Sequence, residues 1–382
     1  MKTILYVFSV LALAITTSTA HATKARNAAM GNSFHLRGTQ TVYSSPYHLS
    51  NIDNFIAIES GLTTLPNTPA SSSNGAEGSA SMNVGETSKL LVSLGHIDET
   101  VQPLRSLVNA VGPFTFKTQQ NPIEFIYSTK PEEKTIYGAG IYYSNFNNKT
   151  TGAEEKESSV GLRIGGSHDK FGWKLNLGLT NTAENPTNKF KGNTYIGLGL
   201  RYKQDNNSYA FDYTTWGAKV ENTTGTTVQE HDYANIVLRM VNSVKADGNE
   251  IFWGAGLNQV NIKDKVTDKK MNRLFLPVVV GFEAKATDWL LLRGSITQAV
   301  FLSNAKDERP YPAVSGITTP ANGTLDLEYA GEPNTTSVAV GAGMKFQKVT
   351  IDGTLKDLMT SSGGQKLDGA NVLAQVGVVY SY

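Results

Sequence analysis

The sequence predicts an all-β chain that forms a single antiparallel transmembrane β-barrel. Three observations predict it: segments of strand length in which apolar residues recur at every second position, connections that alternate between short turns and long polar loops, and a last segment, 372–382, that alternates to its final residue. Because the side chains of a strand point alternately to its two faces, such segments have one apolar and one polar face. A mean hydropathy of −0.25 agrees with a barrel, since alternation hides the apolar face in the average.

The first residues are predicted to be a secretory signal peptide. Lys2 supplies a positive charge, residues 4–15 are almost wholly apolar, and Ala20-His21-Ala22 has the A-x-A pattern of a cleavage site. The apolar stretch is shorter than the ~20 residues that a spanning helix needs. The chain is therefore divided into a signal peptide at 1–22, a periplasmic or plug segment at 23–50, and the barrel at 51–382.

Strands are predicted from Pro122 onward by their period of two. Phe171 and Trp173 face one way, for example, while Gly172 and Lys174 face the other. Most segments have about 9–13 residues, as in strands that cross an outer membrane at a tilt, whereas soluble strands have about 5–6. The predicted strands lie near 122–130, 134–146, 157–167, 171–180, 192–203, 208–219, 229–244, 250–262, 272–286, 289–302, 335–347, 349–357 and 371–382.

The connections between these strands alternate in length. Short turns on one side and long loops on the other are typical of the periplasmic and extracellular ends of bacterial barrels. The short turns are predicted at 131–133, 168–170, 204–207, 246–249, 287–288 and 347–348. The long polar loops are predicted at 147–156, 181–191, 220–228, 263–271, 303–334 and 358–370.

Parity limits the number of strands. If the last strand ends in the periplasm, the thirteen strands from residue 122 onward begin by descending, and an even total needs an odd number before them. One earlier strand gives 14 and three give 16. The region 51–94 contains at least one candidate, 54–60, and another at 82–94; 14 strands are favoured within a range of 12–18. Residues 98–111 are predicted to be a helical insertion, because Asp98 can cap it and Gly112-Pro113 ends it.

Charged residues opposite the apolar faces are predicted to point into the barrel. An Arg or Lys that faces lipid at mid-bilayer costs about 2–4 kcal/mol, so these side chains should face water or one another. They line a channel with a weak anion preference, or they form ion pairs that brace the wall. The predicted pore-lining residues are Arg163, Lys174, Arg201, Lys203, Asp212, Arg239, Arg293 and Lys345, opposed by the acids Glu124, Glu283 and Asp352.

The longest loop, 303–334, contains a charged run before a proline pair. Asp307, Glu308 and Arg309 precede Pro310-Tyr311-Pro312. The loop is predicted either to fold inward as a constriction or to face outward as a contact surface.

No motif predicts catalysis, a metal site or a cofactor. None of the six histidines lies in an H-E-x-x-H pattern, and no G-x-S-x-G elbow occurs. The pairs Gly138/Gly140 and Gly341/Gly343 lie inside strands, so they are interpreted as relief of crowding and not as a phosphate-binding turn. A net charge of +1 gives no reason to expect a nucleic-acid partner.

The last strand carries a resemblance to a known group of proteins. Val376, Val378, Tyr380 and Tyr382 share one face, and this pattern resembles the C-terminal assembly signal of Gram-negative outer-membrane β-barrels. The resemblance implies a place in the outer membrane, contact with its lipid and lipopolysaccharide, and recognition by the barrel-assembly machinery. It leaves a homo-oligomer open.

The segment after the signal peptide carries a second resemblance. Ala25-Arg26-Asn27-Ala28-Ala29-Met30-Gly31-Asn32, followed by Ser45-Pro46 and Leu49, is similar to the plug-forming leader of the long-chain fatty-acid transporter superfamily. That resemblance implies 14 strands and a leader inside the barrel. Together, the two resemblances also suggest the porin-like major outer-membrane proteins of some proteobacteria.

Three functions follow as hypotheses, and none is enzymatic. The leading one is a porin-like channel for passive diffusion of small hydrophilic solutes, which requires an open lumen. The second is a plugged barrel that transports hydrophobic compounds, which requires residues 23–50 inside the barrel and an apolar pocket beneath the loops. The third is a structural or surface-interaction barrel with a blocked lumen.

We expect Tyr382→Ala, or deletion of residues 380–382, to impair insertion into the outer membrane, because the terminal aromatic is part of the predicted assembly signal. Insertion is measured by the amount of heat-modifiable barrel in outer-membrane fractions. A normal amount in the mutant would count against this role.

Overall fold

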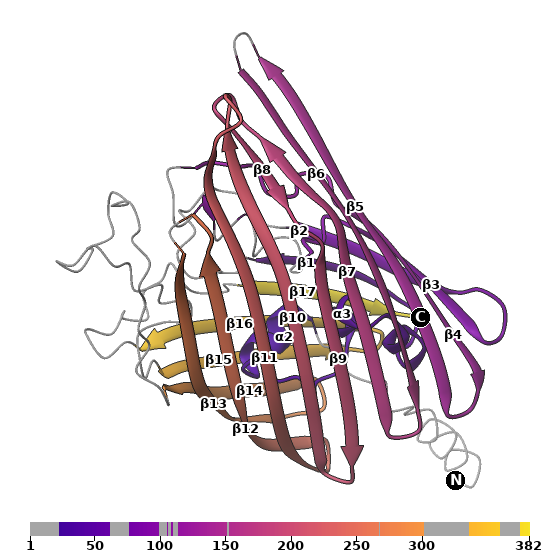
Figure 1. Cartoon of the computed structure of the whole chain (residues 1–382). Coiled ribbons are helices and arrows are strands. Elements are labelled where there is room, and N and C mark those ends of the chain that lie inside the picture. Colours follow the sequence, from indigo (N-terminus) through magenta and orange to yellow (C-terminus); the bar gives the residue numbers. More distant parts are fainter. Residues whose placement is uncertain are drawn as a thin grey trace, which may run out of the picture.

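The chain folds as a closed antiparallel β-barrel (Figure 1). The structure is a computed structural model, and it describes residues 23–61, 76–98, 105, 108–109, 114–150, 153–266, 268–301, 336–359 and 375–382. Neighbouring strands follow the order of the chain, and the first strand pairs with the last.

Sixteen of the described strands form the ring, each paired with two neighbours. Such closure suits a membrane, because lipid offers no partners to an unpaired strand edge. The ring strands are β1 (Phe55–Gly61), β2 (Ala76–Asn83), β3 (Ser88–Leu94), β4 (Ile123–Glu132), β5 (Thr135–Thr150), β6 (Ala153–His168), β7 (Phe171–Glu184), β9 (Tyr195–Gln204), β10 (Asn207–Asn222), β11 (Thr227–Ala246), β12 (Asn249–Asp264), β13 (Lys269–Lys285), β14 (Leu290–Phe301), β15 (Thr336–Phe346), β16 (Val349–Met359) and β17 (Gln375–Ser381). A further strand, β8 (Asn188–Gly192), lies outside this ring and pairs with β7 and β10 beyond the end of β9.

The observed 16 ring strands lie within the predicted range of 12–18 and replace the favoured count of 14. Every strand predicted from residue 122 onward is present, as β4 to β7 and β9 to β17. The prediction of one strand over 82–94 was wrong: Val84 N donates to Ser88 O at 2.8 Å and Gly85 has a φ of +74°, so the chain turns there between β2 and β3. The turn was not predicted because Met82 and Val84 keep apolar residues at every second position as far as its first residue.

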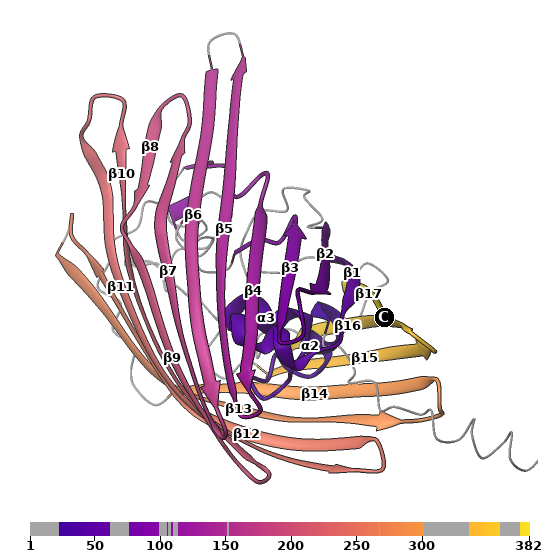
Figure 2. The same ribbon diagram turned by 90° about the vertical axis from the view of Figure 1, so that its right-hand side faces the viewer.

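Four of the predicted long loops are largely strand. The segments 147–156, 181–191, 220–228 and 263–271 belong mostly to hairpins, and β5 pairs with β6 as far as Thr150 and Ala153 (Figure 2). β11 alone has 20 residues, about 66 Å at 3.3 Å per residue. Crossing a bilayer needs only about 9–11 tilted residues, so the remainder lies beyond the bilayer. Its outer face meets water instead of lipid, and the apolar alternation is lost there while the main chain stays paired. The loop 303–334, with Asp307, Glu308 and Arg309, and residues 360–370 lie outside the described residues.

The outer face of the barrel is apolar. Ile58, Leu200 and Leu238 point outward and are 65%, 57% and 49% exposed. Exposed aromatic side chains gather near the short turns, and neighbours stack there, as Trp289 does on Phe346 with ring centroids 6.1 Å apart. Lipid-facing barrels have this surface, with aromatic rings at the headgroup level. No helix within the described residues is both long and apolar enough to span a membrane.

Strand β17 closes the ring between β16 and β1. Ser381 lies opposite Phe55, and Gln375 lies opposite Gly61. Tyr382 extends the seam, because its N–H donates to Asn54 O at 3.0 Å and its hydroxyl donates to a β2 carbonyl, Ser81 O, at 2.8 Å.

We expect Leu238→Arg to destabilise the barrel by about 2–4 kcal/mol, because it places a charge on the outer face at mid-wall. Val244→Arg is the matched control. Val244 lies on the same face of β11 but beside the short turn at Asp247-Gly248, where the cost falls to about 0–1 kcal/mol. Urea unfolding in lipid vesicles measures both, and equal losses of stability would mean that this face does not cross the bilayer.

Candidate functional site in the lumen

The lumen contains residues 23–52, called the plug from here on (Figures 1 and 2). The plug consists of α2 (Lys24–Ala29), α3 (Thr39–Ser44) and the 3-10 helix η1 (Pro46–Asn51), with short connections. α2 contacts β14 to β17, and η1 contacts β3 to β6, so the plug reaches from one part of the wall to another. Met30, Val42 and Leu49 have no exposed surface.

A buried cluster of charges fixes α2 to the wall. Arg26 donates from Nε and Nη2 to the two carboxylate oxygens of Glu283 on β13, at 2.7 and 3.0 Å. Arg293 of β14 joins Glu283 to Asp352 of β16, at 2.5 Å each, and Thr23 Oγ1 donates to Asp352 at 2.8 Å. Burial alone would lower the pKa of Arg26, but its bonds to Glu283 raise it above the ordinary value. Removing one partner of a buried pair costs about 3–5 kcal/mol, because it leaves the other charge uncompensated.

A second cluster fixes the plug to β1 and β2. Glu59 and Glu77 lie directly opposite each other in the strand register and are both buried. The plug supplies their donors: the N–H of Lys24 donates to Glu59 at 2.5 Å, its Nζ lies 2.6 Å from Glu77, and the Gln40 amide donates to both. His96 lies 2.9 Å from Glu77. Like charges opposite each other on neighbouring strands are otherwise destabilising, so these two acids depend on the plug.

Glycines of the wall form the surface on which the plug rests. A Cβ added to Gly138 would lie 2.8 Å from Tyr47 Cα, and one added to Gly341 would lie 2.6 Å from Ala29 Cβ. The same holds for Gly377 of β17, where it would lie 2.7 Å from Thr23 Cβ. Sequence reasoning interpreted Gly138 and Gly341 as relief of crowding. The spacing of these glycines was visible in the sequence, but no local pattern indicated that the plug would pack against them.

Three predicted pore-lining cations converge on a fourth predicted residue, Asp212 of β10. Lys174, Arg201 and Arg239 lie 3.5, 2.8 and 2.5 Å from its carboxylate. Arg201 and Arg239 also lie over the ring of Phe34 in the plug, 5.8 and 5.2 Å from its centroid. The cations that the sequence places separately therefore share one acid and one aromatic ring of the plug.

The remaining predicted residues lie in three places. Arg163 pairs with Asp98 at 2.8 Å and with Glu124, and all three are buried. Lys203 lines a cavity described below, and Lys345 lies near the short turn between β15 and β16. Ion-pair clusters thus include Arg163, Lys174, Arg201, Asp212, Arg239 and Arg293. Whether any of the eight lines a conducting path stays a prediction.

A cavity of about 640 Å³ lies between the plug and the short turns of β5 to β11. Arg37, Lys203 and Lys245 contribute positive charge to its lining, and the imidazole of His48 of η1 also lines it. Burial, followed by the charges of Arg37 and Arg201, lowers the pKa of His48 to about 3, so its imidazole is neutral at neutral pH. The cavity lining holds six Lys or Arg residues and three acids, Glu133, Asp169 and Asp205, so it is basic on balance.

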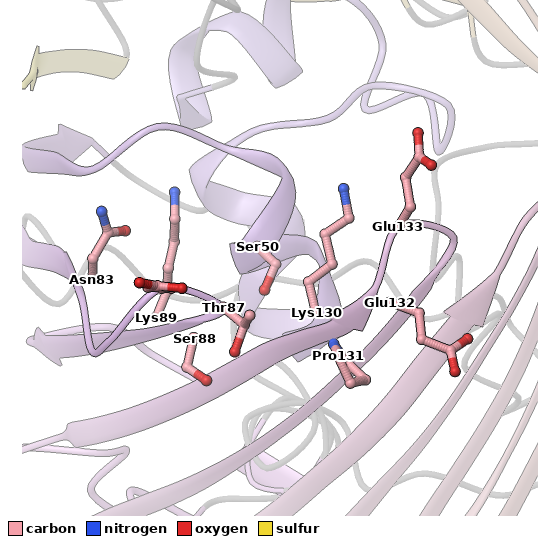
Figure 3. A pocket seen from close by; sticks show the side chains of 10 residues that line it. Ser50, Asn83, Thr87, Ser88, Lys89, Lys130, Pro131, Glu132 and Glu133 are labelled. Atoms are coloured by element: carbon pink, nitrogen blue, oxygen red, sulfur yellow. The ribbon is translucent and has the colours of Figure 1, made fainter.

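A smaller pocket of about 330 Å³ lies at the turns after β2 and β4 (Figure 3). Ser50 of the plug, Lys89, Lys130 and Glu132 line it. Lys89 also donates to the carbonyl of Ile52, where the plug joins the barrel. The lining of this pocket contains both acidic and basic side chains. Among the described residues, none belongs to a group of three or more His, Cys, Asp or Glu side chains that could hold a metal ion.

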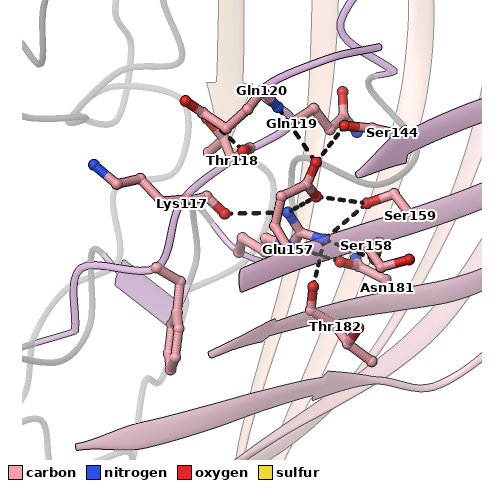
Figure 4. Close-up of polar contacts among 12 residues, drawn as sticks. Lys117, Thr118, Gln119, Gln120, Ser144, Glu157, Ser158, Ser159, Asn181 and Thr182 are labelled. Carbon is pink, nitrogen blue, oxygen red and sulfur yellow. Dashed lines mark hydrogen bonds and ion pairs between the residues drawn. The ribbon is translucent and has the colours of Figure 1, made fainter. Parts of the chain in front are cut away.

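On the long-hairpin side, Arg105 fixes the insertion between β3 and β4 to the wall. Arg105, Val108 and Asn109 are helical, and the rest of the predicted helix 98–111, apart from Asp98, lies outside the described residues. The buried guanidinium donates to Asn181, Glu157 and Ser159 side chains at 2.7 Å each (Figure 4). It also donates to the main-chain oxygens of Lys117, Ser158 and Thr182.

An apolar cluster lies next to this anchor, inside the barrel. Phe114 and Phe116 of the insertion pack with Phe190 of β8 and Trp216 of β10, and Trp216 stacks on Tyr233 with ring centroids 4.7 Å apart. The interior of an open porin is polar, so an aromatic cluster on the inner face is a departure from that pattern. The remaining members are Val108, Ala183, Ala218, Val220 and Ile262, with Tyr195 and Val260 packed against them.

Comparison with known proteins gives likeness in fold. No protein-family model matches the chain, and no curated protein matches it. Among solved structures, it is similar to a FadL homologue from Pseudomonas aeruginosa (10% identity, 88% of this chain and 91% of the other, TM-score 0.37) and to the CymD monoaromatic hydrocarbon channel (13%, 93% and 96%, TM-score 0.39). It is also similar to the alcaligin outer-membrane receptor FauA from Bordetella pertussis (10%, TM-score 0.42), covering 80% of this chain and about half, 51%, of that receptor. The closed antiparallel barrel itself confirms, at the level of fold, the predicted resemblance to outer-membrane β-barrels.

We expect Gly138→Ala to displace η1, because the new methyl group meets the main chain of Tyr47 and no side chain can move aside. Gly78→Ala is the control, since its methyl group would meet nothing closer than 3.9 Å. Limited trypsin digestion at Arg26, which is 5% exposed, reports release of the plug. Equal protection of the two variants would show that the plug does not rest on Gly138.

Proposed function

We propose that the chain is a gated transport barrel of the outer membrane that admits small apolar compounds, with the plug as its gate. The observation that carries this proposal is the plug itself, held in the lumen by Arg26, Glu283, Arg293 and Asp352. A passage for cargo then requires the plug to shift, which separates this barrel from a permanently open pore.

The outer surface supports a place in the outer membrane. Its apolar rows and the aromatic side chains near the short turns match what lipid and headgroups require. Contacts with lipopolysaccharide and with the assembly machinery belong to the same proposal, as do the roles of Val376, Val378, Tyr380 and Tyr382 in assembly.

The apolar cluster supports the choice of cargo. Phe116, Phe190 and Trp216 belong to a buried aromatic cluster on the inner face of the long-hairpin side, which an apolar compound arriving from outside would reach when the insertion that carries Phe116 shifts. Small apolar molecules bind where aromatic and aliphatic side chains line a site with few polar groups. The second of the three sequence hypotheses, the plugged barrel for hydrophobic compounds, is therefore the one favoured.

The charges inside the barrel support a wall-bracing role. Arg293 is bound by two acids, so its field is largely cancelled at close range. Lys174, Arg201 and Arg239 share the single acid Asp212 and keep a net positive charge. A weak anion preference would then come from this excess and from Arg37, Lys203 and Lys245 around the basic cavity. This positive charge is the observation that still supports the first hypothesis, a porin-like passage for hydrophilic solutes.

Two measurements on the purified barrel test the proposal. In planar bilayers with KCl, we expect the whole chain to conduct little and a chain lacking residues 23–50 to form open channels, whose reversal potential in a salt gradient reports anion preference. Binding of radiolabelled naphthalene should weaken about tenfold, or about 1.4 kcal/mol, in Trp216→Ala. Trp253→Ala, on the outer face, is the matched control.

Steady conductance with the plug in place would favour the open porin and contradict the gate. Unchanged naphthalene binding in Trp216→Ala, with a normally folded barrel, would contradict the apolar cargo.

A further inference from the structure

The residue that follows the predicted cleavage site lies at the centre of the α2 cluster. Thr23 has no exposed surface, its hydroxyl donates to Asp352 at 2.8 Å, and it accepts the N–H of Arg26 at 3.1 Å as the cap of α2. Gly377 leaves just enough room for its side chain. Thr23 is therefore held in one position by its contacts with the wall and with α2.

Taken together, the two clusters that hold α2 do not balance in charge. The described acids outnumber the permanent cations by one, and His96 adds a positive charge only when it is protonated. A buried carboxylate without a counter-ion is costly, so it must either take up a proton or gain a further cation. The acids are Glu59, Glu77, Glu283 and Asp352, and the cations are Lys24, Arg26 and Arg293.

The main-chain nitrogen of Thr23 lies close to Glu59, one of these four acids. Lys24 N is 2.5 Å from Glu59, and standard bond lengths put Thr23 N about 3.6 Å further along the extended backbone, hence roughly 6 Å or less from this carboxylate. An opposite charge at about 4–6 Å favours the charged form of an amine. The nitrogen is also covalently tied to the Thr23 hydroxyl that binds Asp352.

We propose that cleavage of the Ala22–Thr23 bond creates an α-ammonium group that serves as the fourth cation of this cluster, so that the plug docks fully only in the processed chain. Hydrolysis by a secretory peptidase adds one water across the amide. The leader leaves with the Ala22 carboxylate, and the freed Thr23 amine takes up a proton. Before cleavage the same nitrogen is a neutral amide, and Glu59 accepts hydrogen bonds from neutral groups, the Lys24 N–H, Thr39 and Gln40, among the described contacts. The inference does not depend on the cargo.

The first test is the mass of the barrel isolated from outer membranes, which should correspond to a chain that begins at Thr23. The second uses refolded chains that begin at Thr23 and carry either a free or an acetylated α-amine, each with and without Glu59→Gln. Acetylation removes the positive charge of the α-amine and with it the attraction to Glu59. If this attraction equals one pKa unit, the plug is released ten times more often, so we expect trypsin to cleave at Arg26 about tenfold faster. In the Glu59→Gln chains the unpaired acid is gone, and the two rates should agree within about twofold.

A mature chain that begins elsewhere would overturn the proposal, as would equal protection of free and acetylated chains. An equal acceleration with and without Glu59→Gln would mean that the acetyl group acts by its bulk, which also overturns it. Heat-modifiable mobility must be normal in all four chains. A barrel that fails to form after acetylation contradicts the proposal too, because the proposed effect is confined to the plug.

Discussion

The structure depends on one constraint: main-chain groups that face lipid must all be paired, and the sheet can meet this only by closing on itself. The pairing of β1 with β17 provides the closure. Closure of sixteen strands has its own consequence, because barrels of 16–18 strands enclose a space too wide for wall side chains to fill. The plug and the Arg105 insertion occupy that space from the two ends, so the contents of the lumen follow from the size of the ring.

Filling a polar lumen with protein brings charges out of water. Ion pairs offset this cost, and many of them join a side chain of the plug to a side chain of the wall. Glu283, for example, binds Arg26 of the plug and Arg293 of the wall. Each cluster is therefore complete only when both parts are in place. Such buried ion pairs are weak as a source of stability, but they fix one position of the plug among the many that an apolar contact would tolerate.

The sequence was sufficient for most of the wall and for little of its contents. Period-two alternation located the strands from β4 onward because lipid and lumen act on alternate residues of each strand. Alternation failed where that difference ends, in the turn at Val84 to Thr87 and in the hairpins beyond the bilayer, where polar strands look like loops. The sequence could assign Arg201, Arg239 and Asp212 to the inside of the barrel. Their convergence depends on how β9, β10 and β11 are aligned with one another, and the sequence of one strand does not determine that alignment. The partnership of Arg26 with Glu283 joins residues 257 positions apart, and sequence carries no local sign of it.

The glycines under the plug have a further consequence. Gly138, Gly341 and Gly377 shape the lumen by the side chains they lack, so the inner surface of the wall is complementary to one particular segment of main chain. A change in the plug from Ala29 to a larger residue and a change in the wall from Gly341 to alanine are thus the same steric event seen from two sides. Wall and plug are expected to vary together among relatives of this chain, as two subunits of an obligate complex do, although a single polypeptide encodes both.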